Sequence, residues 1–169
     1  MRFFPLLLLL AACAAGAADL NEDLLAAARK GDLAAVKALV GKGADVNTRT
    51  HYGVTPLFYA AANGHLEVVR LLIDKGADPN PKDTFYNATA VGWAASKGQV
   101  AVVKLLLEKG AAVDEVLLAG VAGGHLELVK AALARGGYRK ETVDKALAAA
   151  AQRKNVEMQE LLRTAGGGK

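Results

Sequence analysis

Cysteine is almost absent from this sequence, which has one among 169 residues, Cys13. A single cysteine cannot form an intramolecular disulfide, so no covalent cross-link can hold the fold together. The patterns of catalytic and metal sites are missing too: there is no HExxH, CxxC or GxSxG motif and no phosphate-binding loop. The three histidines fall at no metal-ligand spacing. We therefore expect no enzymatic activity, no metal site and no cofactor.

Aromatic residues and prolines are also scarce. Aromatics make up 5% of the chain and prolines number four, whereas 53% of the residues are hydrophobic, with alanine and leucine supplying much of that share. No stretch shows the alternation of apolar and polar residues that predicts a β-strand. Small helix-forming residues favour closely stacked helices over a large aromatic core. The composition therefore predicts an all-α fold.

Residues 1–18 have the layout of a secretory signal peptide. Arg2 is followed by an apolar run over residues 3–12 and then by a tail of small residues. The apolar run is too short for a comfortable membrane span. We expect cleavage after Ala17 or Ala18, which leaves no membrane span and predicts an exported protein of the bacterial type, periplasmic or secreted.

A second interpretation of the same segment is a lipid anchor. Leu10-Ala11-Ala12-Cys13 looks like the lipobox of bacterial lipoproteins, in which Cys13 would be acylated and tethered to the envelope membrane. Cleavage before Cys13 would leave a signal shorter than the usual length of roughly 15–30 residues. The sequence favours soluble export and leaves the anchor open.

The chain is mildly basic, with a formal net charge of +4. This charge predicts either ordinary solubility or a partner that carries negative charge. So small a charge is weak evidence for nucleic-acid binding, and an exported protein would not meet nucleic acid. We expect no nucleic acid among the partners.

Residues 53–80 contain a complete helix-turn-helix unit. Thr55 can cap a first helix with Pro56 at its first position, and Asn63-Gly64 ends that helix. A second helix then runs to Lys75 with one apolar stripe. Two such short helices cannot close a core alone, so the unit must stack on copies of itself.

Copies of the unit run through the chain from residue 19 to residue 165. The turn glycine recurs at Gly31, Gly64, Gly98 and Gly124, and Lys154 takes its place in a fifth copy. Residues 166–169 read as a disordered tail. The five copies span approximately residues 20–49, 50–83, 84–113, 114–138 and 139–165.

The unit resembles the ankyrin repeat in its Thr55-Pro56-Leu57, Gly64-His65 and Gly76-Ala77-Asp78 segments. The resemblance implies a solenoid of about five helix pairs whose connecting loops project as β-hairpin fingers. The shortened spacing between Gly98 and Gly124 leaves no room for a third finger, so we expect two full fingers, near residues 44–54 and 77–88. The terminal repeats depart from this pattern: the first has no finger before it, and the fifth has the polar Gln159 and Arg163 at positions that are apolar in the second copy.

The family's binding residues lie on the fingers and first helices, the concave side of the solenoid. The finger ring pairs His51-Tyr52 and Phe85-Tyr86 either anchor a partner or pack on the neighbouring finger. By its position in the repeat, Trp93 is expected to lie half in the core. Basic residues recur at one repeat position, Lys30, Lys97 and Arg153, and they either attract an acidic partner or shield the ends of short helices. Projected onto this chain, the candidate partner-binding residues are Arg29, Lys30, His51, Tyr52, Asn63, Phe85, Tyr86, Trp93, Lys97 and Arg153.

We predict from these features a non-enzymatic protein-protein interaction module that is exported and monomeric. It would hold a protein or peptide partner, which the basic residues suggest is acidic, on its concave surface. A lipid-anchored structural or protective component of the envelope, acylated at Cys13, is the alternative.

Overall fold

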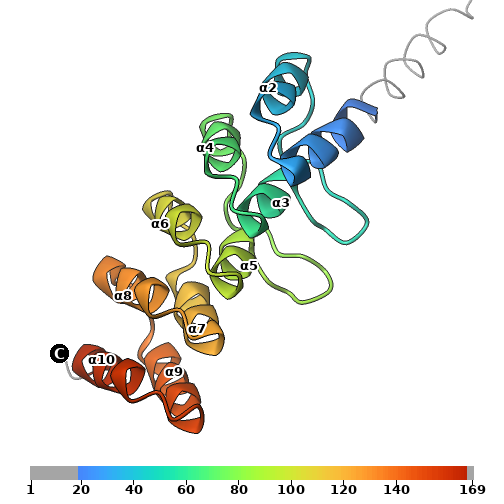
Figure 1. Ribbon diagram of the computed structural model, residues 1–169. Helices are drawn as coiled ribbons and strands as arrows, with labels where there is room; N and C mark the ends of the chain where they lie inside the picture. The colour runs from blue at the N-terminus through green and yellow to red at the C-terminus, as the bar shows by residue number, and fades with distance from the viewer. Residues whose placement is uncertain (1–18, 167–169) are drawn as a thin grey trace, which may run out of the picture.

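The computed structural model describes residues 19–166, and every regular element among them is a helix. The helices form five pairs that stack side by side into an elongated array, with the first helices in one layer and the second helices in another (Figure 1). The all-α prediction is thereby confirmed for this part of the chain. Helical residues 19–30 are followed by α2 (Leu33–Gly41), α3 (Pro56–Ala62), α4 (Leu66–Asp74), α5 (Ala90–Ser96), α6 (Val100–Glu108), α7 (Val113–Gly123), α8 (Leu126–Arg135), α9 (Lys140–Gln152) and α10 (Val156–Gly166).

Side-chain caps start several of these helices as the sequence predicts. The Thr55 hydroxyl accepts a hydrogen bond of 3.3 Å from the Phe58 amide, and Pro56 fills the first helical position, where its missing N–H leaves nothing unsatisfied. Thr89 caps α5 without a proline, accepting from the Gly92 amide at 3.3 Å. The first helices of the second and third pairs therefore begin at matched positions.

Turn glycines set the distance between neighbouring pairs. Gly31 has a left-handed φ of +77°, and a Cβ built on it would lie 2.4 Å from Nδ1 of His65 in the next repeat. The Nε2 of His65 is 3.1 Å from the carbonyl oxygen of Arg29. His125 repeats the arrangement over Gly98. Each histidine thus joins its own turn to the preceding one through a backbone carbonyl oxygen.

The core lies between the two helix layers and runs along the whole stack. Val69, Val103 and Val129 on successive second helices are fully buried, and so are alanines of the first helices such as Ala60 and Ala94. Small side chains on the first helices let neighbouring pairs approach closely. The repeat is therefore stable only as part of the stack.

The two predicted fingers are present as long loops, residues 42–55 and 75–89, which project on the same side of the array (Figure 1). Here we call them the finger loops. The prediction that they are β-hairpins was wrong: within residues 19–166 there is no strand, and the finger loops contain only an isolated bridge between Lys82 and Thr89. Some of their amides donate to backbone carbonyls, as Thr50 does to Val54 at 2.9 Å. Others bond to side chains, as when Thr50 Oγ1 accepts from the amides of Tyr52 and Val54.

Later connections are short, because α6 and α7 are separated only by residues 109–112 and α8 and α9 only by residues 136–139. Asp114 ties the last connection by accepting from the Arg139 amide at 3.0 Å and from its Nε at 2.9 Å. At the end of the chain, α10 reaches Gly166, one residue into the predicted tail.

Neither the predicted signal peptide nor Cys13 lies within the described residues, and the same holds for residues 167–169 of the tail. Among residues 19–166, no helix is both long and apolar enough to cross a membrane.

Candidate binding surface

Asp83 organises the second finger loop. Its carboxylate accepts from the backbone amides of Phe85 (2.8 Å), Tyr86 (2.5 Å) and Ala88 (3.3 Å) and from Nε1 of Trp93 (3.1 Å), while only 4% of the residue is exposed. Burial alone would raise the pKa of Asp83, but the hydrogen bonds from Tyr86, Trp93, Phe85 and Ala88 outweigh it and hold the pKa below its ordinary value of 3.8. One ionised carboxylate thus fixes the finger loop against helix α5.

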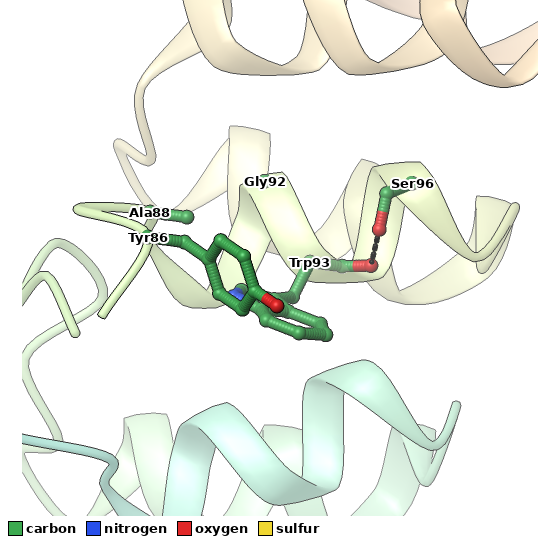
Figure 2. A pocket seen from close by; sticks show the side chains of 5 residues that line it. All are labelled: Tyr86, Ala88, Gly92, Trp93 and Ser96. Atoms are coloured by element: carbon green, nitrogen blue, oxygen red, sulfur yellow. Dashed lines mark hydrogen bonds between the residues drawn. The ribbon is translucent and has the colours of Figure 1, made fainter. Parts of the chain in front are cut away.

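The rings around Asp83 form a connected cluster. Phe85 and Tyr86 meet edge to face with centroids 4.6 Å apart, Tyr86 meets Trp93 in the same way at 5.4 Å, and Trp93 lies 5.8 Å from the buried ring of Phe58. Figure 2 shows Tyr86 and Trp93 lying against each other beside a small cavity of about 180 Å³. Edge-to-face contact is a favoured arrangement of aromatic rings. The exposed rings are therefore held in place before any partner arrives.

The first finger loop completes the cluster. The Thr84 amide donates to the Tyr52 carbonyl oxygen at 3.0 Å, which brings the two finger loops together. The Tyr52 ring packs edge to face on His51, with centroids 5.2 Å apart. Together the loops, α3 and α5 line an open cavity of about 270 Å³, here called the ring pocket. Its lining residues are Tyr52, Val54, Phe58, Asp83, Phe85, Tyr86 and Trp93.

A second cavity, of about 430 Å³, adjoins the ring pocket and is here called the basic pocket. The two cavities have Val54, Phe58 and Trp93 in common as walls. The residues that line the basic pocket are Arg29, Val54, Phe58, Tyr59, Ala62, Asn63, Trp93 and Lys97.

The two cations of the basic pocket have no acidic partner in the part of the chain that the structure describes. No Asp or Glu side chain there makes an ion pair with Arg29 or Lys97. Lys97 Nζ lies 6.0 Å from the centre of the Trp93 ring, within reach of a cation-π contact. Asn63 Nδ2 donates to the Arg29 carbonyl oxygen at 3.1 Å. The basic pocket therefore carries positive charge next to an aromatic wall.

The structure brings some of the predicted site residues together and leaves others apart. Tyr52, Phe85, Tyr86 and Trp93 meet at the ring pocket, and Arg29, Asn63, Trp93 and Lys97 meet at the basic pocket. Lys30, His51 and Arg153 are exposed but line neither pocket.

Five residues that line the two pockets are absent from the candidates predicted from the sequence: Val54, Phe58, Tyr59, Ala62 and Asp83. Val54 comes directly before the Thr55 cap and Phe58 comes three residues after it, and nothing in their spacing predicts that they line a pocket. Asp83 had a usable signal, because an aspartate in a loop often accepts hydrogen bonds from amides two and three residues later. Its bond to Trp93, ten residues on, depends on the fold and not on local sequence.

No metal site competes with this surface in the described part of the chain, where no three His, Cys, Asp or Glu side chains are grouped so as to hold a metal ion. The two pockets present apolar ring surface and, in the basic pocket, two cationic side chains.

The family model for ankyrin repeats matches residues 24–117 in three copies, which is more than half of the chain. A search of curated proteins finds no match to the chain. Ankyrin repeats generally act as protein-protein interaction modules. With the stacked helix pairs and turn glycines described above, this match establishes that the chain belongs to the ankyrin repeat family.

Proposed function

We propose that the protein is a non-enzymatic module that holds a protein or peptide partner on the surface made by the finger loops and the first helices. One observation carries this proposal: Tyr52, Phe85 and Tyr86 are 59%, 70% and 65% exposed around one cavity. Exposure of large rings to water is unfavourable, so a partner that covers them gains free energy from their burial. Because Asp83 already fixes the second loop, binding costs little conformational entropy.

The charge of the same surface supports an acidic partner. Arg29 and Lys97 line the cavity beside the rings, and no described carboxylate pairs with either. Opposite charge on a partner would steer its approach and increase the association rate, most strongly at low salt.

We also propose that this module is exported to the periplasm or the medium and acts there as a soluble monomer. The layout of residues 1–18 motivates this part of the proposal. Mass spectrometry of the mature protein tests it: an N-terminus at Ala18 or Asp19 is expected. An acylated N-terminal Cys13 would support the alternative, an envelope component held by a lipid anchor, and size-exclusion chromatography with light scattering tests the monomer.

The binding role is tested by partner capture from an envelope extract with tagged protein. Replacing Tyr52, Phe85 and Tyr86 by alanine should abolish capture, because aromatic anchors of interfaces are worth about 2 kcal/mol or more each. The control replaces Leu33 and Val156, exposed apolar residues on the second helices α2 and α10, and should capture as the native protein does. Undiminished capture by the ring variant would remove the finger loops from the account.

A further inference from the structure

The ring pocket and the basic pocket differ in the chemistry that they offer a ligand. Asp83 is the one charged residue that lines the ring pocket, and its two oxygens already accept from three amides and one indole N–H. A carboxylate has about four acceptor positions, so little capacity is left for a cationic ligand. The remaining walls are rings and one valine, so the pocket suits a large apolar side chain.

The basic pocket offers the opposite chemistry. Arg29 and Lys97 reach it from two different helix pairs, and Tyr59 adds a side chain with a hydroxyl group. Arginine and lysine side chains donate hydrogen bonds and accept none, so a ligand must supply acceptors. A carboxylate supplies acceptor oxygens and neutralises the charge.

The ring pocket, which suits an apolar side chain, and the basic pocket, which suits a carboxylate, are neighbours. They meet along Val54, Phe58 and Trp93, so a short segment that fills one pocket reaches the other. In an extended chain, side chains two residues apart point to the same face and are about 6.6 Å apart. Because the Asp83 charge repels a carboxylate from the ring pocket, the carboxylate side chain belongs in the basic pocket and the apolar side chain in the ring pocket.

We propose that the surface recognises an extended peptide segment in which a carboxylate side chain lies two residues from a large apolar side chain. The apolar side chain occupies the ring pocket and the carboxylate lies between Arg29 and Lys97. This inference rests on the proposed function and adds the chemistry and spacing of the partner to it.

Trp93 makes the proposal measurable in solution. It is the only tryptophan of the chain and a wall of both pockets, so its fluorescence reports their occupation. The probe is a peptide with blocked ends, Ser-Glu-Ser-Phe-Ser-Glu-Ser, which presents glutamate two residues from phenylalanine in both chain directions. Blocked ends remove the terminal carboxylate as a competing source of charge. We expect a saturable change in Trp93 fluorescence that weakens as salt is added.

Three related peptides test the two contacts. Replacing both glutamates by glutamine should weaken binding about fivefold, the effect of losing two solvent-exposed ion pairs. Replacing phenylalanine by alanine should abolish the response. Replacing both glutamates by lysine should abolish it as well.

Protein variants assign the carboxylate contact to the basic pocket. Arg29→Gln with Lys97→Gln should bind the glutamate and glutamine peptides equally. The matched control, Lys37→Gln with Lys104→Gln, removes the same charge from exposed positions on the second helices α2 and α6 and should keep the preference.

Several outcomes overturn this inference without touching the proposed function, which partner capture judges separately. Equal binding of the glutamate and glutamine peptides by the native protein would show that the basic pocket does not select acid. Preference for the lysine peptide would show that the rings and Asp83 select a cation. No saturable change with the glutamate peptide at millimolar concentration would also overturn it.

Discussion

The two halves of the stack use the same helix pair but join it in different ways. In the finger half, residues 19–108, loops 42–55 and 75–89 separate successive pairs, whereas in the fingerless half, residues 109–166, the connections are 109–112 and 136–139 (Figure 1). The helix array continues unchanged across the boundary. The comparison teaches that the finger loops are not needed for stacking, which leaves them available for binding.

The cross-repeat bonds differ accordingly. In the finger half, Asn47 of the first finger loop accepts from the Asp78 amide at 2.8 Å and donates to the Gly76 carbonyl oxygen at 3.1 Å. In the fingerless half, the cross-repeat contact is an ion pair in which Asp114 accepts hydrogen bonds from the amide and Nε of Arg139. Burial would raise the pKa of Asp114, but hydrogen bonds from the Thr142 side chain and from Arg139 lower it below 3.8. Two kinds of polar contact therefore hold one architecture.

The largest effect is expected at the boundary between the halves. Leu117 of α7 is fully buried where α7 packs on α5 and α9, so Leu117→Ala should cost about 2–5 kcal/mol through the cavity that it leaves. If the halves form one cooperative stack, circular dichroism and Trp93 fluorescence should shift together in urea. A Trp93 transition that stays in place while the helical signal shifts would contradict the single stack.

A smaller effect should separate two glycines of equal backbone geometry. Gly98 (φ +71°) would bring a Cβ within 2.8 Å of the His125 ring, whereas Gly124 (φ +73°) has no atom within 4 Å of that point. Alanine at either site incurs about 1–2 kcal/mol of left-handed strain. Gly98→Ala should cost about 1 kcal/mol more, because His125 must release the Ser96 carbonyl oxygen. Equal melting temperatures for the two variants would refute the histidine link.

Asp83→Asn should loosen the second finger loop by about 1–3 kcal/mol, since the amide cannot accept all four hydrogen bonds. Because the pKa is lowered in the folded protein, the carboxylate contributes stability above 3.8 that is lost as the pH falls through the folded-state pKa. Trp93 fluorescence should show this acid transition in the native protein and not in the variant. Asp114→Asn, in the fingerless half, serves as the control and should retain it.

The smallest effect on stability is expected for the variant that should lose the most binding. Tyr52, Phe85 and Tyr86 are largely exposed, so replacing all three by alanine should change the free energy of unfolding by less than about 1 kcal/mol. Urea denaturation measures this directly. A loss as large as that of Leu117→Ala would mean that the rings are structural and would remove the contrast between the halves.

Most of the scaffold could be predicted because its causes are local. The Thr55 cap, the Gly31 and Gly98 turns and the short connection before α7 follow from residue type and spacing. The finger loops keep a few backbone hydrogen bonds, such as that from the Thr50 amide to the Val54 carbonyl oxygen, but Thr50 and Asp83 draw other finger amides to their side chains, and no strand forms. Propensity alone does not reveal that competition.

The candidate site was less predictable because its contacts cross repeats. At the start of α5, the Thr89 hydroxyl donates to a carboxylate oxygen of Glu115, from the next pair, at 2.6 Å. A Cβ on Gly92 would lie 2.8 Å from the same carboxylate. No local pattern connects positions so far apart in sequence.

Hydrogen exchange with and without the captured partner tests the central claim most directly. The account predicts that the partner slows exchange in residues 42–55 and 75–89 and at the ends of α3 and α5 that line the pockets, and leaves α8 and α10 unchanged. Slowed exchange confined to residues 109–166 would contradict it, because the fingerless half would then be the binding surface.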